Sequence, residues 1–300
     1  MFEYVKEYLK INDVEYKEEL LLKSISPIRI GGRARLVVYP DGEEKIVSLV
    51  AFLTEIGCGY RIFGKMSNVL PPDEDIDTVI IRTDRMCSVR LENGELYAQS
   101  GAPIPRVASI AAISGLGGFE ELSGIPGTVG GAVVGNAGAF GREISDLFLC
   151  GRCYFPEYRA VEQILPSDLN FKYRHSNLKK INCLVLSCRF KLFSSTSSEL
   201  EEKKSYFAAV RRASQPTTLP SLGSTFKRPN SALSAGAMID QCGLKGFAVG
   251  DAMISEKHAG FIVNFGEASA ADYIAVAEAA EREVYKRFGV KLEKEIEILN

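Results

Sequence analysis

The sequence predicts a mixed α+β protein with more than one domain. Two observations support this. Strand-like and helix-like segments alternate through the first two thirds of the chain, and a charged helix over residues 197–212, followed by a Pro-rich connector at 215–220, precedes a second set of elements. With 300 residues, 46% apolar and 25% charged, the composition is that of a globular protein with a substantial core. We therefore expect an α+β fold ending in a smaller C-terminal domain.

Charge and cysteine content restrict the partners. The formal net charge of −2 argues against nucleic acid and anionic membrane, and a small molecule is the expected partner. The N-terminus mixes both charges without an apolar export segment, and no apolar run reaches 18 residues. Seven cysteines, an odd number, favour reduced thiols over disulfides. These observations predict a cytoplasmic protein that contacts no membrane.

The N-terminal third is expected to contain a βαβ unit and a further strand. Residues 41–44 (DGEE) resemble a capping box, and apolar residues recur behind them at helical spacing until Gly57. The strands are expected at 35–39, 60–63 and 79–82.

The middle of the chain is expected to begin with a hairpin over residues 89–98, because Asn93-Gly94 suits the two central positions of a type I′ turn. A helix of small residues follows from Pro103 to about Ser114. Residues 147–193 are strand-like, with one polar break at 167–177.

The C-terminal part is expected to hold a short helix over residues 235–242, strands near Ala248 and at 260–264, and a long helix that Ser269 caps and Gly289 ends. A last strand is expected over 290–299. Its alternation predicts Leu292, Ile296 and Ile298 on a buried face and Glu293, Glu295 and Glu297 on a solvated one.

A glycine-rich segment at residues 123–146 is the most unusual part of the sequence. Seven glycines are interleaved with apolar residues such as Ile125, Val129 and Phe140, whereas a flexible linker, the alternative, would be polar. Backbone without Cβ atoms can present successive N–H groups, aided by a helix N-terminus, to an anion. The segment therefore predicts a phosphate-binding loop.

Other motifs are weaker. Residues 59–65 come close to a P-loop but have Met66 where a hydroxyl is required, and a Gly-x-Gly-x-x-Gly fingerprint is absent. Cys150 and Cys153 have the spacing of a metal site without a second pair, so ordinary thiols and no metal are expected. Residues 168–176 carry Lys172 and Arg174 on a polar break, which taken alone favours a solvated turn. Residues 221–229 carry Lys227 and Arg228, and an anion contact and the mere entry to a domain both remain open.

Several separated motifs together resemble the UDP-N-acetylenolpyruvoylglucosamine reductase family from about residue 26 to the C-terminus. Each motif alone is weak, but their joint order is specific. They are residues 27–32 (PIRIGG), 67–68 (SN), 123–131 (SGIPGTVGG), 136–139 (NAGA), 173–176 (YRHS), 223–229 (GSTFKRP), 235–240 (AGAMID), 243–246 (GLKG), 255–259 (SEKHA) and 292–296 (LEKEI).

The resemblance implies an FAD-binding region of the vanillyl-alcohol-oxidase (PCMH) type with two subdomains, followed by a substrate domain. The implied ranges are 1–25 for a lead-in helix, 26–85 and 86–195 for the FAD-binding subdomains, and 205–300 for the substrate domain. The implied FAD contacts are Arg29, Gly64, Lys65, Ser67, Asn68, Ser123, Gly124, Gly127, Thr128, Gly130, Gly131, Asn136, Ala137 and Gly138.

The implied reaction is ping-pong reduction of UDP-N-acetylglucosamine enolpyruvate by NADPH through FAD, in a protein expected to be a monomer. Arg174 is implied to bind the substrate carboxylate, Ser224 to donate the proton to C2, and Glu295 to orient or polarise the same carboxylate. The implied substrate contacts are Tyr173, Arg211, Lys227, Arg228 and His258.

The sequence departs from the family pattern at one place, and it lacks the tyrosine-bearing loop that one branch folds over the substrate. Lys65 and Met66 stand where the family has a glycine-richer run before Ser67-Asn68. Two alternatives are an FAD-linked oxidase or dehydrogenase of the same fold and a flavin-binding paralogue without turnover. The presence of Ser224 and Glu295 argues against both.

Overall fold

A computed structural model describes residues 1–92 and 94–299 of the chain. The chain divides into two compact units, which we describe separately. Unit 1 comprises residues 1–18, 35–65 and 77–209, and unit 2 comprises residues 19–34, 66–76 and 210–300. Segments 19–34 and 66–76 therefore belong with the C-terminal part of the chain, although the resemblance assigns residues 26–34 and 66–76 to the cofactor-binding region and residues 19–25 to the lead-in. The four predicted domain ranges remain a prediction.

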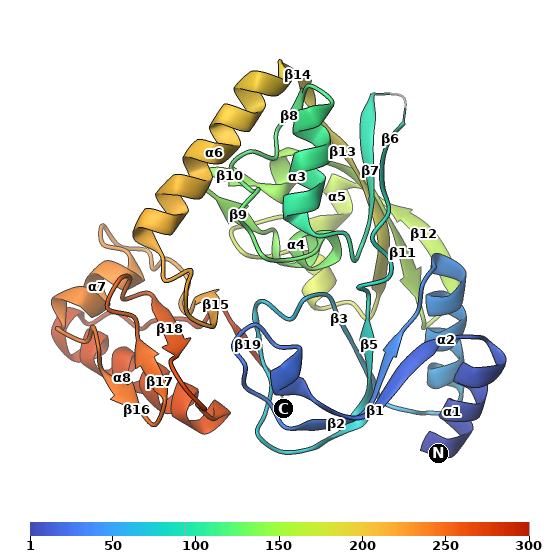
Figure 1. The fold of residues 1–300 in the computed structure, drawn as a ribbon, viewed down its shortest axis with the longest axis horizontal. Helices are drawn as coiled ribbons and strands as arrows, with labels where there is room; N and C mark the ends of the chain where they lie inside the picture. The colour runs from blue at the N-terminus through green and yellow to red at the C-terminus, as the bar shows by residue number, and fades with distance from the viewer. Residues whose placement is uncertain (93, 300) are drawn as a thin grey trace. The chain divides into compact units, whose positions relative to one another are not determined.

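Unit 1 begins with helices that cover a four-stranded sheet of order β1-β2-β5-β3 (Figure 1). Strands β3 and β5 pair in parallel, and β5 lies between β2 and β3, so the strands that flank α2 are not neighbours. Apolar residues of α1, α2 and this sheet form one core. The elements are α1 (Phe2–Ile11), β1 (Glu15–Leu21), β2 (Arg33–Tyr39), α2 (Glu43–Glu55), β3 (Tyr60–Phe63) and β5 (Ile76–Arg82).

The second part of unit 1 is an antiparallel sheet of order β12-β11-β13-β7-β6, against which α4 packs (Figure 1). A second core fills the space between this sheet, α3 and α4. The elements are β6 (Val89–Glu92), β7 (Glu95–Gln99), α3 (Ile104–Ile113), β8 (Leu116–Gly117), α4 (Val129–Gly135), β9 (Gly138–Ala139), β10 (Arg142–Glu143), η2 (Ile144–Asp146), β11 (Phe148–Phe155), β12 (Ala160–Ile164), α5 (Pro166–Leu169), η3 (Asn177–Lys179), β13 (Leu184–Lys191), β14 (Phe193–Ser194) and α6 (Ser197–Ser214).

Unit 2 contains a sheet of order β15-β18-β17-β16 and a two-stranded parallel pair, β4 with β19. Its core is formed by this sheet, α7, α8 and the buried Ile28, Ile30 and Leu70. The elements are η1 (Leu22–Ser24), β4 (Val69–Leu70), β15 (Ser221–Ser224), α7 (Ala235–Gln241), β16 (Ala248–Val249), β17 (Ala252–Ile254), β18 (Phe261–Asn264), α8 (Ala270–Phe288) and β19 (Glu297–Ile298).

Most predicted elements are present at the predicted places. Ser269 caps α8 with a complete capping box, and Gly289 ends this helix at φ +66°. The predicted hairpin is present as β6 and β7, in which Val89 pairs with Ala98 at one end and Glu92 pairs with Glu95 at the other. Asn93, which was predicted in its turn, lies outside the described residues. Cys150 is half-buried and Cys153 buried, as expected of ordinary thiols.

Two local predictions are wrong. The N-cap of α2 is Gly42, without a side-chain cap, because the helix begins at Glu43 and Asp41 lies one residue before the cap, where its carboxylate pairs with Lys45 at 3.2 Å. Ile298 is 36% exposed instead of buried, because the predicted strand over 290–299 is reduced to β19, Glu297–Ile298, and both of its side chains are exposed.

Candidate active site

In unit 1, Arg174 lies at the tip of a tight turn. Lys172 and His175 exchange two backbone hydrogen bonds of 3.0 and 2.9 Å, which leaves Tyr173 and Arg174 as the two central residues. Arg174 has φ +54°, a left-handed conformation that costs a non-glycine residue about 1–2 kcal/mol. A position that favours glycine thus holds an arginine, which is typical of a functional site.

The Arg174 turn is bound to the glycine-rich segment. Arg174 Nη2 donates to the Gly138 carbonyl at 2.8 Å. The fully buried Asn136 donates through Nδ2 to Glu143 Oε2 at 2.8 Å and to the Lys172 carbonyl at 3.0 Å, and its Oδ1 accepts from the Ser145 N–H at 3.0 Å. The Asn136 side chain, which the resemblance places among the FAD contacts, therefore joins this segment to the Arg174 turn.

Helix α4 begins inside the glycine-rich segment, with Thr128 as its N-cap. The N–H groups of Val129 and Gly130 donate to the carbonyls of Ala102 and Ser100 at 2.9 and 2.8 Å. The expectation that successive N–H groups face an anion is therefore wrong for these two residues. A Cβ on Gly130 would lie 3.0 Å from the Ser100 Cβ, so this glycine serves packing.

Other glycines of the predicted cofactor site leave room for a ligand or permit close approach. Gly131 is exposed, and a Cβ there would meet only Thr128 Oγ1, at 3.7 Å. A Cβ on Gly64 would lie 2.2 Å from Thr128 Oγ1, so the residue that follows β3 touches the start of α4. Two segments that the resemblance assigns to FAD are thus adjacent, beside open backbone at Gly131, and these residues fit an extended cofactor.

In unit 2, Ser224 is exposed at the end of β15, and the residue after it is fixed from two sides. The Thr225 N–H donates to the Gly260 carbonyl at 2.8 Å, and the hydroxyls of Thr225 and Tyr273 are hydrogen-bonded at 3.0 Å. Both side chains are fully buried, and burial raises the pKa of Tyr273 above its usual value. The hydroxyl pair therefore stays neutral and holds β15 against α8.

Glu295 lies beside the Ser224 segment. Its N–H donates to the Thr225 carbonyl at 2.8 Å, and its own carbonyl accepts from Asn68 Nδ2 at 3.0 Å. A bridge between Phe226 and Lys294 continues the contact. Ser224 and Glu295, far apart in sequence, are thus carried by neighbouring segments of one unit.

The predicted substrate contacts differ in availability. Lys227 forms an ion pair with Glu293, whose side chain was expected only to face solvent. His258 Nδ1 accepts from the Gly260 N–H at 3.1 Å, and burial lowers the pKa of His258. Arg211 is half-buried, and burial also lowers its pKa, whereas Tyr173 and Arg228 are exposed.

The remaining predicted FAD contacts are dispersed over both units. The Ser123 hydroxyl donates to the Glu120 carbonyl at 2.7 Å. Lys65 in unit 1 and Arg29 in unit 2 are exposed, and Arg29 has φ +57°. Gly124, Gly127, Ala137 and Ser67 are half-buried.

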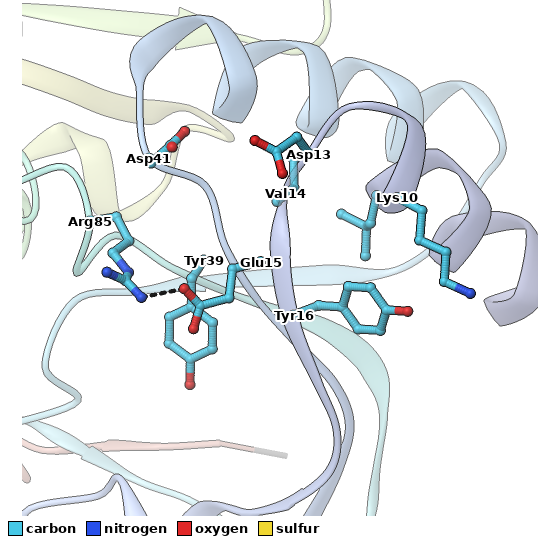
Figure 2. A pocket seen from close by; sticks show the side chains of 9 residues that line it. Lys10, Asp13, Val14, Glu15, Tyr16, Tyr39, Asp41 and Arg85 are labelled. Atoms are coloured by element: carbon cyan, nitrogen blue, oxygen red, sulfur yellow. Dashed lines mark hydrogen bonds and ion pairs between the residues drawn. The ribbon is translucent and has the colours of Figure 1, made fainter.

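A separate cavity of about 450 Å³ lies in unit 1 between α1, β1 and the end of β2. Figure 2 shows its lining, in which Arg85 points toward Glu15 and pairs with it. The residues that line it include none of the predicted site residues. Among its charged groups, Asp13 and Asp41 pair with Lys45, so most of the lining charge is already compensated and the cavity gives no indication of a ligand.

Within residues 1–92 and 94–299, no helix combines the length and apolarity needed to cross a membrane. In the same residues, no three His, Cys, Asp or Glu side chains gather in a way that suits a metal ion.

The hydroxyl pair of Thr225 and Tyr273 and the bond from the Asn68 amide to Glu295 were not predicted from the sequence. Thr225 was predicted only as part of the motif at residues 223–229, and no role was predicted for the Tyr273 hydroxyl. The one available signal was a second hydroxyl residue directly after Ser224.

Comparisons with known proteins agree on one family. Residues 34–151 match the family described as FAD binding domain, and residues 215–299 match the C-terminal domain of UDP-N-acetylenolpyruvoylglucosamine reductase. The relative of that name from Caldicellulosiruptor saccharolyticus is 40% identical over 292 residues, which cover 97% of this chain and 93% of the relative. The relative from Enterococcus faecalis is 33% identical, with 96% of each chain covered.

A solved structure of the same kind of protein supports the match. The crystal structure of UDP-N-acetylenolpyruvylglucosamine reductase from Thermus caldophilus superposes with a TM-score of 0.81 at 33% identity. The match covers 96% of this chain and 99% of that one. The predicted fold, an FAD-binding region followed by a smaller α+β domain, is therefore confirmed.

Proposed function

The chain belongs to the UDP-N-acetylenolpyruvoylglucosamine reductase family, and from this premise we propose how its residues divide the reaction. The reaction is the NADPH-dependent reduction of UDP-N-acetylglucosamine enolpyruvate to UDP-N-acetylmuramate, a step of peptidoglycan precursor synthesis. Its cofactor is FAD. Our proposal also includes the cytoplasm as the compartment and a monomer as the working form.

We assign FAD binding first to the segments that meet at Gly64 and Thr128 and to the exposed backbone at Gly131. Bound FAD would supply the hydride for C3 of the enolpyruvyl group, with NADPH as its source. The chain must then bind the substrate carboxylate, stabilise the negative charge that develops on it, and protonate C2.

Arg174 is assigned to the carboxylate. Its guanidinium presents several N–H donors in a planar fork that matches a carboxylate, and it keeps its charge throughout the reaction. The hydrogen bond from Nη2 to Gly138 fixes one side of the fork at 2.8 Å. The left-handed backbone at Arg174 supports this assignment, because strained backbone at non-glycine residues is concentrated at functional sites.

Ser224 is assigned as the donor of the proton to C2, and Glu295 as the residue that orients or polarises the substrate carboxylate. An aliphatic hydroxyl is a weak acid, so Ser224 needs a nearby cation as the proton leaves. Lys227 can supply that charge once it leaves Glu293, with which it is paired. Ser224 is exposed and regains its proton from water.

The observation that best supports this division is the backbone hydrogen bond from Glu295 to Thr225. This bond joins the segment that carries the proton donor, Ser224, to the segment that carries the Glu295 carboxylate, as the reaction requires. An FAD-linked oxidase of the same fold has no need of this pair. A flavin-binding paralogue without turnover would be free to lose it.

The test is anaerobic. The purified holoenzyme is bleached with NADPH, UDP-N-acetylglucosamine enolpyruvate is added, and the flavin absorbance is followed while the product is analysed by mass spectrometry. We expect the absorbance to return and the sugar nucleotide to gain two hydrogens. The opposing result is a flavin that stays bleached with this substrate. If a small alcohol then reduces the flavin and oxygen reoxidises it, the oxidase alternative replaces the proposal.

A further inference from the structure

The peptide groups on both sides of Glu295 are fixed by partners from two other segments of unit 2. Thr225, next to Ser224, accepts from the Glu295 N–H at 2.8 Å, and the Asn68 side chain donates to the Glu295 carbonyl at 3.0 Å. We propose that Asn68 is a positioning residue for Glu295, which it holds at the orientation that the reduction of the enolpyruvyl group requires. This inference rests on the proposed function.

The backbone pairing around Glu295 explains why its carbonyl is bound by a side chain, that of Asn68. Before Glu295, the bridge between Phe226 and Lys294 holds the chain, and after it Glu297 pairs with Val69 in the parallel strands β4 and β19. Glu295 falls in the gap between these two pairings. The Asn68 amide supplies the donor for its carbonyl there, and the Asn68 carbonyl accepts from the Glu297 N–H at 2.9 Å.

Asn68 therefore contacts the Glu295 segment through both its side chain and its backbone. Glu295 is half-buried, so its carboxylate direction depends on the orientation of the peptide to which it is attached. A shift of about 1 Å at a group that binds substrate can slow a reaction about 100-fold. The competing account is that Asn68 serves FAD retention, as the sequence resemblance implies.

The variant that separates the two accounts is Asn68→Asp. It keeps the shape of the side chain, removes the donor, and places a carboxylate oxygen against the Glu295 carbonyl. We expect the holoenzyme to keep its FAD and its rate of bleaching by NADPH within about twofold. We expect reoxidation by UDP-N-acetylglucosamine enolpyruvate to slow about 10- to 100-fold. Loss of FAD or equal slowing of both half-reactions would support the competing account and overturn the proposal.

Two companion variants control for charge and for local disturbance. Asn68→Ala removes the donor without adding a charge, and it must slow the same half-reaction even if the aspartate variant does not fold. Glu297→Gln alters an exposed side chain two residues from Glu295 while the backbone bond to Asn68 is kept. It should leave both half-reactions unchanged, and slowing of reoxidation in this variant would contradict a specific role for Asn68.

A double-variant cycle tests whether Asn68 acts through Glu295. If it does, Asn68→Ala added to Glu295→Gln causes no further slowing of reoxidation, because the group that it positions is already gone. Multiplicative slowing would overturn the proposal. The wild-type reaction distinguishes this failure from that of the proposed function: absence of reoxidation in wild type contradicts the function itself, whereas normal wild-type reoxidation with unaffected Asn68 variants contradicts only the positioning role.

Discussion

Replacing Gly131 by Ala, with Gly130→Ala as a matched control, separates cofactor binding from packing within one turn of α4. A Cβ on Gly131 meets only Thr128 Oγ1, at the ordinary distance of 3.7 Å. The fold should therefore gain about 0.5–1 kcal/mol, the usual advantage of Ala over Gly in a helix. A Cβ on Gly130 lies 3.0 Å from the Ser100 Cβ and 3.2 Å from the Ser100 carbonyl oxygen, and we expect a cost of about 1–3 kcal/mol.

FAD binding should respond differently in the two variants. If the cofactor lies against the exposed Gly131 backbone, the added methyl group occupies its space. We expect a loss of about 1–3 kcal/mol of binding, or roughly a 5- to 150-fold higher Kd. The assays are denaturant unfolding without added FAD and titration with FAD by flavin fluorescence quenching. A Gly131→Ala variant that binds FAD as tightly as wild type would refute this placement of the cofactor.

Three predictions concern unit 2. Tyr273→Phe should lower the free energy of unfolding by about 1–3 kcal/mol, because it leaves the buried Thr225 hydroxyl without this partner. Adding Thr225→Val should recover most of the loss, and a further loss in the double variant would contradict this explanation. Glu293→Gln should free Lys227 and lower the KM for the enolpyruvyl substrate up to about fivefold, the limit for an exposed ion pair, and a raised KM would exclude a substrate role for Lys227. Because burial lowers the pKa of His258, the unfolded chain binds more protons than the folded chain below pH 6.5, so stability should fall as the pH drops below that value. In His258→Gln, the denaturation midpoint should fall less steeply with pH across this range. A fall as steep as in wild type would refute the prediction.

Local features of the fold were predictable where a short segment decides its own structure. The cap of α8 was predicted because Ser269 and Asp272 bond to backbone groups three residues away. The cap of α2 was wrong because the helix begins one residue later than the motif suggests, which leaves Asp41 before the N-cap, and the sequence does not fix this boundary. The burial of Ile298 was wrong because the two-residue strand β19 pairs with β4 but leaves both of its side chains exposed.

The site was predictable in its residue types but not in its connections. The order of the motifs identified the family, and the matches to known proteins confirmed it. Asn68 and Asn136 were both predicted as cofactor contacts because they lie in cofactor motifs. Their amides bind the carbonyls of Glu295 and Lys172, which long-range folding brings near them, and a sequence motif gives no sign of these partners.

Flavin reoxidation in Ser224→Ala is the most direct test of the central claim, that this chain is a reductase in which Ser224 donates the proton. After anaerobic bleaching with NADPH, the enolpyruvyl substrate should restore the flavin absorbance promptly in wild type. In the variant, bleaching should proceed at the wild-type rate while the return of absorbance slows by about 100-fold or more, the usual contribution of a general acid. Equal slowing of bleaching and return, or a return as fast as in wild type, would contradict the account.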